Sequence, residues 1–360
     1  MQLKYSLHQT AKLLNHGTRS LQTLSDESGL NIVRAATGQR ARQYSAENIF
    51  DLATYIRSQN AARSKPLPRR AITCHIPRGG SGKTLTATNL AVLFSALGIK
   101  TCLVDLDWQG SASSIFGYDP DVDSAIAAAR GISADKAVDY HIGHMLGLQG
   151  APRVPFSSVV KYPFGINGPA LIPADVTLNQ IEATLTVERL NSDRADLVFF
   201  DWMKKTPELL LYELVIFDSG PGFSRTVNAA LSSCDMVIAP VGLESISEKG
   251  LRMLESQIKT INERHKSSIE IRIIPNGMVN TKRSLQELGA ISTGYPGLVI
   301  PYPIKRSEDV PKAYTHEKED RSDPLMPFAL KYPMSEVTQS LSHITQIIGS
   351  ELWPDGGFEK

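Results

Sequence analysis

Short apolar runs recur along the chain from residue 71 onward, and they predict buried strands. Runs of this kind, without alternating polar residues, are typical of parallel strands covered on both faces. The first run leads through a glycine-rich turn into a stretch over 85–97 that reads as a helix. The sequence therefore predicts an α/β domain over 71–355, with a mostly parallel sheet flanked by helices. The runs that predict its strands are 71–76, 101–106, 170–174, 214–218, 234–241, 271–276 and 298–303.

The first 58 residues carry a helical pattern instead. Apolar residues line one face of a predicted helix over 6–15, and a second helix over about 18–25 follows a glycine turn. Two short helices joined in this way suggest a helix-turn-helix. Ser45 is a good N-cap for a third helix, whose inward residues are Ile49, Phe50, Leu52 and Ile56. We expect a small helical domain over 1–58.

The net charge of +1 hides an uneven distribution. Residues 1–70 hold eleven Lys and Arg against four acids, a balance of +7, so the remaining 290 residues carry −6. A basic head on a mildly acidic body suggests that the head meets a polyanion. Residues 59–70 lack apolar periodicity and contain two prolines, so we interpret them as a basic linker that is semi-rigid near those prolines.

Composition gives no sign of export or of a membrane span. The N-terminus has no apolar signal segment, and no run is long enough to cross a bilayer. A helix predicted over 335–352 carries more acids than cations, which favours packing on the protein body over membrane binding. The three cysteines sit singly in apolar strands and read as reduced core residues: Cys74, Cys102 and Cys234. We expect a cytoplasmic protein.

The glycine-rich turn over 77–84 carries the chemistry. Strand, glycine-rich turn and helix form the context in which backbone N–H groups wrap phosphates, with help from the helix N-terminus. Lys83 is placed to neutralise phosphate oxygens, and the Thr84 hydroxyl to hold Mg²⁺. The standard P-loop pattern G-x-x-x-x-G-K-[ST] is not met, because Pro77 occupies its first glycine position. The turn instead fits the variant [basic]-G-G-x-G-K-T, in which a second cation, Arg78, precedes the glycines.

Two further strands end on carboxylates, as expected where the carboxyl edge of a parallel sheet carries a site. The run over 101–106 leads to Asp105 and Asp107, and the run over 214–217 ends at Asp218 before Ser219-Gly220-Pro221-Gly222. Apolar residues followed by Asp are the Walker B arrangement, in which the carboxylate holds Mg²⁺ through water. Asp105 and Asp107 alone could be a solvated strand end, and apolar residues before a single Asp are a weak signal. Together and in this order the motifs indicate nucleotide chemistry.

These motifs resemble the deviant Walker A ATPases, which include the ParA partition proteins, MinD and the nitrogenase iron protein. The basic residue five positions before Lys83 is their mark, although Arg78 stands where the family has Lys, and Trp108 replaces a proline of the second motif. The resemblance covers about 70–350 and implies ATP and Mg²⁺ as ligands. The isolated cysteines count against an iron–sulfur relative.

The resemblance also implies a role for each site residue. The nucleotide would contact Gly79, Gly80, Ser81, Gly82, Lys83, Thr84 and Thr86, with Asn276 at the adenine. Thr84 and Asp218 would serve Mg²⁺, and Asp107 would orient the attacking water with support from Asp105. Arg78 would reach the phosphates of the partner subunit in an ATP-sandwich homodimer; the alternatives are a local salt bridge or a decayed site.

The N-terminal domain resembles the MerR-like winged helix-turn-helix of larger ParA proteins and of RepA proteins of repABC plasmids. By that resemblance Arg19 and Ser20 would face the DNA major groove, while Arg40 and Arg42 on the wing would contact phosphate. The alternative is a helical docking or dimerisation module with a solvated basic face. Arg225, Lys282, Arg283, Lys305 and Arg306 are further candidates for non-specific DNA contact.

The function implied is that of a partition ATPase associated with the nucleoid. ATP would close a dimer that binds DNA, and hydrolysis stimulated by a ParB-like partner would release it; autorepression of its operon is a further implication. The open alternatives are a DNA-binding regulator whose ATPase is weak or lost, and a MinD-like positioning ATPase. The sequence assigns no role to residues 118–205.

Overall fold

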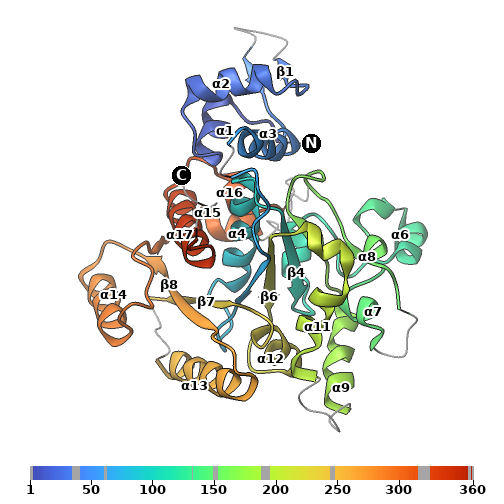
Figure 1. Ribbon diagram of the computed structural model, residues 1–360, viewed down its shortest axis with the longest axis vertical. Coiled ribbons are helices and arrows are strands. Elements are labelled where there is room, and N and C mark those ends of the chain that lie inside the picture. Colours follow the sequence, from blue (N-terminus) through green and yellow to red (C-terminus); the bar gives the residue numbers. More distant parts are fainter. Residues whose placement is uncertain are drawn as a thin grey trace.

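A parallel sheet forms the centre of the computed structural model, which describes residues 3–34, 41–60, 63–131, 133–148, 153–187, 195–243, 248–314, 325–355 and 358 (Figure 1). In the described residues its order is β5-β4-β6-β3-β7-β8-β9, and all neighbours are parallel. The α/β prediction is therefore confirmed. The strands are β3 (Arg70–Cys74), β4 (Thr101–Leu106), β5 (Ala170–Ile172), β6 (Leu214–Ser219), β7 (Met236–Gly242), β8 (Glu270–Met278) and β9 (Ile304–Lys305).

One predicted strand is misplaced. The run over 298–303 makes a single bridge, from Val299 to Ile273, and the regular strand β9 follows it. Pro301 and Pro303 lie between these two points. Proline has no backbone N–H to donate to a sheet, so it interrupts the pairing there.

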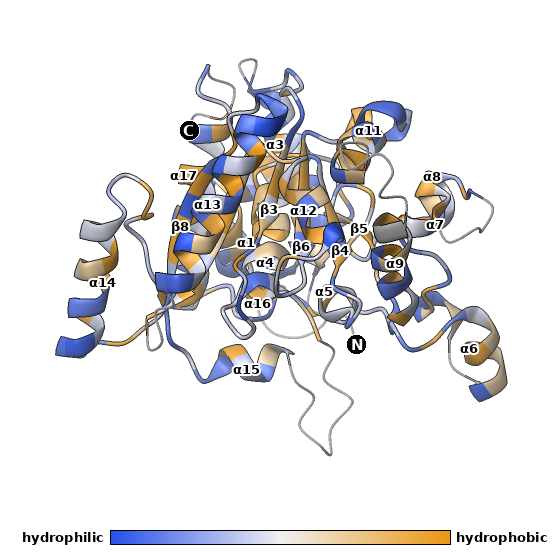
Figure 2. Ribbon diagram, turned by 90° about the horizontal axis from the view of Figure 1, so that it is seen from below, coloured by the Kyte–Doolittle hydropathy of each residue, from blue (hydrophilic) through white to orange (hydrophobic). Residues whose placement is uncertain are grey.

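Helices cover both faces of the sheet, whose strands are predominantly hydrophobic in Figure 2. One face packs against α4 (Lys83–Ala96), α5 (Ser111–Ile115), α16 (Phe328–Lys331) and α17 (Glu336–Leu352). The other face packs against α7 (Ile142–Leu146), α8 (Phe156–Val159), α9 (Asn179–Val187), α11 (Val198–Lys205), α12 (Arg225–Leu231) and α13 (Glu248–His265). Helices α6 (Ser124–Arg130), α14 (Lys282–Gly294) and α15 (Asp309–Tyr314) lie at the periphery in Figure 2.

The predicted C-terminal helix is α17, and it packs on the protein body as expected. Its apolar residues at helical spacing are buried, and they share one hydrophobic core with α4. In the part of the chain that the structure describes, no helix combines the length and apolar character needed to cross a bilayer.

The N-terminal segment forms three helices and a small hairpin, which lie above the sheet domain in Figure 1. Helices α1 (Leu7–Leu13) and α2 (Thr18–Glu27) precede strands β1 (Val33–Arg34) and β2 (Arg42–Gln43), and α3 (Ala46–Gln59) follows. Ser6 and Ser45 each form a capping box at the start of α1 and α3, which is the signal that the sequence carries. The order of helix, turn, helix, hairpin and helix agrees with the predicted elements.

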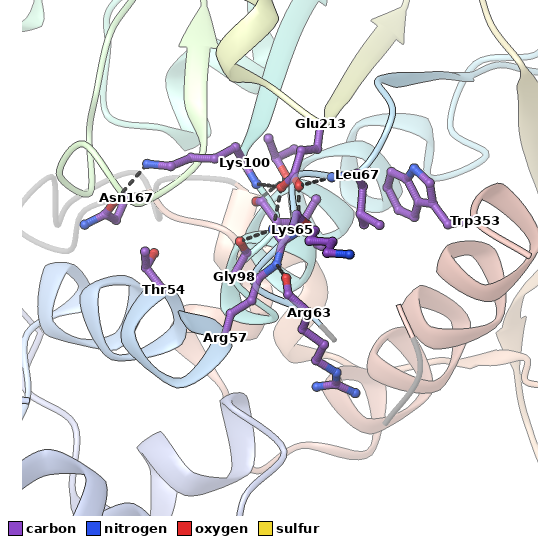
Figure 3. A network of polar contacts seen from close by, with 12 residues as sticks. Thr54, Arg57, Arg63, Lys65, Leu67, Gly98, Lys100, Asn167, Glu213 and Trp353 are labelled. Atoms are coloured by element: carbon purple, nitrogen blue, oxygen red, sulfur yellow. Dashed lines mark hydrogen bonds and ion pairs between the residues drawn. The ribbon is translucent and has the colours of Figure 1, made fainter. Parts of the chain in front are cut away.

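The N-terminal helices are docked directly on the sheet domain (Figure 3). The guanidinium of Arg57, in the last turn of α3, forms two hydrogen bonds to the carboxylate of Glu213, beside β6. Arg57 also donates to the carbonyl of Gly98 at 2.8 Å, just beyond α4. Glu213 in turn accepts the backbone N–H groups of Leu67 and Lys100 at 2.6 and 3.1 Å. The two parts of the chain therefore share a buried polar joint and one continuous core.

The predicted linker is part of this joint. Its described residues from 63 to 69 form no helix or strand, but they do not stand free. The carbonyls of Arg63 and Lys65 accept hydrogen bonds from Arg57, and the indole N–H of Trp353 donates to Pro68 at 2.8 Å. Contacts with α3 and with Trp353 therefore hold a segment that its composition predicts to be a semi-rigid linker.

Part of the unassigned region 118–205 also holds the N-terminal helices. The ring of Phe164 lies 6.0 Å from Phe50 of α3. The side-chain amide of Asn167 donates to Asp51 of α3 at 2.8 Å, while its oxygen accepts from Lys100. This segment thus clamps α3 against the sheet domain.

Candidate phosphate-binding site

The predicted phosphate loop joins β3 to α4 at the carboxyl edge of the sheet. It borders a cavity of about 620 Å³, whose walls also include Asp107, Ser111, Pro221, Asn276, Arg306 and Tyr314. Ligands of open parallel sheets bind at this edge, because loops and helix N-termini meet there. The structure therefore places the loop as the sequence predicts.

Gly82 and Asn276 fit tightly against one another. Gly82 caps α4 with a φ of +96°, a backbone conformation that favours glycine, and a Cβ at this position would lie 2.4 Å from the amide nitrogen of Asn276. That nitrogen donates to the carbonyl of Ser81 at 2.9 Å. Asn276 thus braces the phosphate loop, and its contact with adenine stays a prediction.

Lys83 is buried with its ammonium group turned to the loop. Its Nζ donates to the carbonyl of Arg78 at 2.8 Å. Burial lowers the pKa of Lys83, and the carboxylates of Asp218 and Asp107 oppose that shift. Because a desolvated cation gains from an added anion, the buried ammonium group is suited to phosphate binding.

The two carboxylates that follow β4 have different surroundings. Asp105 is fully buried and accepts three hydrogen bonds: from the N–H and hydroxyl of Ser113 at 2.9 and 2.8 Å, and from the N–H of Asp107 at 3.1 Å. Burial raises its pKa to about 7. Asp107 instead lines the cavity and accepts only from the N–H of Gln109, at 3.1 Å, in the described part of the chain. Asp105 therefore fixes the turn, while Asp107 faces the ligand space.

Asp218 is the most telling residue of the site. Its side chain is fully buried, and in the described residues neither carboxylate oxygen has a partner of ordinary hydrogen-bond distance and angle, although the Thr84 hydroxyl lies near it. Burial raises its pKa well above the usual value, and the nearby Asp105 adds to the shift. A buried carboxylate without partners is rare in native proteins and calls for a cation. With the Thr84 hydroxyl nearby, these residues fit a Mg²⁺ ion held directly or through water.

The cavity is also lined by residues that the sequence did not assign to the nucleotide. Lys305 and Arg306, which were candidates for DNA contact, line it at the end of β9. Tyr314 of α15 also lines it, and its hydroxyl accepts from Asn89 of α4 at 2.8 Å. No local motif marks these residues; only the end of β9 brings them to the loop.

Thr86 and Arg78 lie away from the cavity walls. Thr86 is fully buried inside the first turns of α4. Arg78 is exposed, and its carbonyl rather than its side chain contacts Lys83. An outward Arg78 is compatible with a contact in a partner subunit, which stays a prediction.

The predicted DNA-binding residues have distinct positions. Arg19 and Ser20 are exposed at the start of α2. Arg42 pairs with Asp26 at 2.6 Å and donates to the carbonyl of Gln22, so it joins the hairpin to α2. Arg40 lies outside the described residues.

The remaining candidates for DNA contact also differ in exposure. Arg225 pairs with the buried Asp196 at 3.6 Å, an internal contact. Lys282 and Arg283 are exposed at the start of α14. Exposure alone does not test whether Lys282 and Arg283 contact DNA, so that contact stays a prediction.

Comparison with known proteins extends this geometry. A family model described as an AAA domain matches residues 69–271, more than half of the chain. A putative replication protein A from Rhizobium rhizogenes is 27% identical over 248 residues, which cover 65% of this chain and 56% of that protein. The chromosome-partitioning ATPase Soj from Thermus thermophilus is 30% identical over 192 residues, covering 53% of this chain and 62% of Soj. The chain thus spans less than two thirds of the length of these relatives.

Solved structures agree on the fold. A complex of Cyanothece McdA with ATP matches with a TM-score of 0.58 at 18% identity, covering 79% of this chain and 97% of that one. At this identity the likeness shows the fold alone. The match of the family model over more than half of the chain shows that the chain belongs to the AAA-domain family, and the relatives named above place it with ParA-family proteins.

Proposed function

We propose that this protein is an ATP-dependent partition ATPase that binds Mg²⁺-ATP at the loop over 77–84 and hydrolyses it. The observation that carries the proposal is Asp218, a buried carboxylate without a partner of ordinary hydrogen-bond distance and angle in the described structure, beside a glycine-rich loop and a buried lysine. The ATPase name of Soj and the ATP complex of McdA belong to those proteins and support the same activity here.

Each residue has a defined task in this proposal. Backbone N–H groups of the loop and the ammonium of Lys83 bind the phosphates, so Lys83 exchanges the carbonyl of Arg78 for phosphate oxygens. Thr84 and Asp218 hold Mg²⁺, which when bound neutralises charge on the phosphate oxygens. Asp107 orients the attacking water, and Asp105 keeps the Asp107 backbone in place through the hydrogen bond at 3.1 Å. Arg78 acts on the nucleotide of the second subunit.

DNA is the proposed surface on which the ATPase works. Residues 1–70 carry the excess positive charge, and Arg19 and Ser20 are exposed on the second helix of a helix, turn, helix arrangement. We propose that the N-terminal module binds operator DNA and represses the protein's own operon. The ATP-bound dimer would bind DNA non-specifically, associate with the nucleoid and respond to a ParB-like partner.

Two other functions differ from this proposal in testable ways. A regulator without ATPase activity would bind DNA but not turn over ATP, an outcome that the replacements Arg78 and Trp108 leave open. A MinD-like positioning ATPase would hydrolyse ATP on a membrane or a protein cargo. The apolar face of α17 is already buried against α4, which disfavours a membrane anchor in this helix.

ATP binding by calorimetry and phosphate release, with and without DNA, test the main proposal. Lys83→Ala should abolish both, while Arg130→Ala, which removes an exposed cation at the end of α6, should leave them unchanged. ATP binding without turnover, at any DNA concentration, would favour the regulator. Turnover stimulated by liposomes but not by DNA would favour the MinD-like function.

Binding to the upstream DNA tests the N-terminal module. Arg19→Ala should weaken specific binding about fivefold to 150-fold, as expected for the loss of one base contact worth about 1–3 kcal/mol. Lys12→Ala removes an exposed cation from α1 and is the matched control. Equal binding by both variants and the parent would assign the module to docking instead of DNA recognition.

A further inference from the structure

A buried histidine lies between the phosphate loop and the loop that follows β6. His75 comes directly after β3, and its side chain is fully buried. Its backbone N–H donates to Ile238 of β7 at 2.9 Å, so the residue is held in the sheet. Burial lowers the pKa of His75 to about 3, and the charge of Lys83 adds to this shift. The ring is therefore neutral at ordinary pH.

A short hydrogen-bond chain joins this ring to the end of β6. Nδ1 of His75 lies 2.7 Å from the hydroxyl oxygen of Ser219. That hydroxyl donates its single proton to the carbonyl of Cys74, at 2.9 Å. Because the proton is already used, Ser219 must accept from His75, which places the ring proton on Nδ1. The chain thus ties β3 to Ser219, the residue after Asp218.

The same ring touches the loop a second time. Phe223 packs against His75 with ring centroids 5.5 Å apart. Between these two contacts the loop passes the nucleotide cavity: Pro221 lines the cavity, and a Cβ on Gly220 would lie 3.7 Å from the Asp107 carboxylate. His75 therefore holds both ends of a segment whose middle faces the ligand space and Asp107.

The far end of the loop has its own anchor. Glu182 of α9 accepts the backbone N–H groups of Arg225 and Thr226, at 2.7 and 3.0 Å, where α12 begins. A carboxylate at a helix N-terminus is electrostatically favourable. With α12 fixed in this way and Ser219 paired with Leu106 in the sheet, the contacts of His75 with Ser219 and Phe223 span the segment between them.

We infer that His75 is a positioning residue for hydrolysis: it sets the loop over 219–223 against Asp107 and the nucleotide. This inference rests on the proposed ATPase function. His75 does not contact the cavity and transfers no proton; it acts through Ser219 and Phe223. Displacing a reacting group by about 1 Å can lower the rate about a hundredfold. The position of the loop should therefore affect turnover more than nucleotide binding.

Two replacements separate the contacts of the ring. His75→Phe keeps an aromatic ring against Phe223 but has no donor for Ser219. His75→Asn retains an N–H donor at about the place of Nδ1 but loses the ring. His8→Asn changes an exposed histidine of α1 and controls for histidine loss in general. Ser219→Ala, alone and with His75→Phe, measures whether the two residues act as one unit.

Three measurements on the full chain decide the inference: turnover number, ATP affinity, and hydrogen exchange of the amides over 219–224 without nucleotide. His75→Phe should lower turnover about tenfold or more, leave ATP affinity within about twofold, and speed exchange of the loop. His75→Asn should recover most of the turnover. Ser219→Ala should match His75→Phe, and the double variant should lose little more.

The outcomes separate this inference from the proposed function. Parental turnover in His75→Phe, or equal losses of ATP affinity and turnover in both His75 variants, would overturn the positioning role. If the parent itself binds no ATP, the proposed function fails, and loop exchange still tests the placement. Unchanged exchange in His75→Phe would then show that the hydrogen bond from Nδ1 to Ser219 does not hold the loop.

Discussion

Arg57 and Glu213 lie 156 positions apart in the sequence and form a two-point ion pair at the joint between the N-terminal helices and the sheet. Only 10% and 7% of their side chains are exposed. The pair connects the end of α3 with the residue before β6, and Arg57 also contacts the loop after α4, the helix of the phosphate site. The N-terminal module is thus attached to the element that begins at Lys83.

Glu213→Ala should destabilise the protein by about 3–5 kcal/mol, because it leaves a buried guanidinium and two backbone N–H groups without their acceptor. Urea unfolding measures the change. Lys205→Ala breaks an exposed pair with Asp201 and should cost less than about 1 kcal/mol. The double variant Arg57→Met with Glu213→Leu should lose less unfolding free energy than the sum of the losses in Arg57→Met and in Glu213→Leu. Additive losses would contradict a coupled pair.

Gly98→Ala should weaken the same joint for a steric reason. Its φ is +78°, and a Cβ would lie 2.9 Å from both the carbonyl oxygen of Ala53 and the Cβ of Arg57. Gly117→Ala is the matched control, since its φ is +90° but no atom lies within 4 Å of the added Cβ. The control should lose about 1–2 kcal/mol from backbone strain alone. A greater loss in Gly98→Ala, measured by thermal unfolding, is expected; equal losses would exclude a tight joint.

Asn276→Ala separates a structural from a base-reading role. If Asn276 acts by bracing Ser81, its loss should weaken ATP and GTP binding equally, by about threefold to thirtyfold for one hydrogen bond of about 0.5–2 kcal/mol. Calorimetry with both nucleotides checks this. A loss confined to ATP would instead support the predicted adenine contact. Gly277→Ala is unsuitable as a control, because its φ is +78°.

Mixing inactive subunits tests the proposed action of Arg78 across a dimer. Arg78→Ala and Lys83→Ala should each hydrolyse ATP poorly when alone. In a mixed dimer, the Lys83→Ala subunit supplies Arg78 to the nucleotide held by Lys83 of the other subunit, so one complete site forms. Turnover should then recover to about a quarter of the parental rate in an equal mixture, for random pairing with one active site in half of the dimers. Arg78→Lys should remain active alone, since Lys keeps the cation.

Stability should depend on pH through His141. This side chain is fully buried: it accepts the N–H of Gly143 through Nδ1 and lies 2.9 Å from the Thr177 hydroxyl through Nε2. Burial lowers the pKa of His141 to about 4, with Asp175 opposing the shift and His144 adding to it. The unfolded chain binds this proton at about pH 6.5, so the stabilising contribution is lost as pH falls from about 6.5 to 4.

The expected slope for one such histidine is about 1.4 kcal/mol per pH unit within that window. Burial raises the pKa of Asp105 to about 7, and its contribution has the opposite sign over an overlapping range. The test therefore compares two proteins: urea unfolding gives the free energy of unfolding of the parent and of His141→Gln between pH 4.5 and 7.5, and the difference between them isolates the contribution of His141. The stability gap between them should narrow as pH falls. A gap that stays constant would contradict a buried neutral His141.

Local sequence was sufficient for the phosphate loop and for most strands. The order of Lys83, Asp107 and Asp218 along the chain places each at the end of a strand or the start of a helix, and parallel strands bring such ends to one edge. The capping serine Ser45 likewise marked the start of α3 correctly, because a cap depends on neighbours three residues away. By contrast, the strand predicted over 298–303 is misplaced. Pro301 and Pro303 interrupt the pairing there, and the regular strand is β9.

The sequence by itself determined the α/β class, the phosphate loop and its acidic partners, since periodicity and spacing act over a few residues. Only the tertiary structure decided which distant groups meet: Glu213 with Arg57, Ser219 with His75, and Asn276 with the backbone of Ser81. It also placed Lys305 and Arg306 at the cavity. These contacts depend on how helices dock on the sheet, and docking satisfies buried charges and hydrogen bonds that no local pattern records.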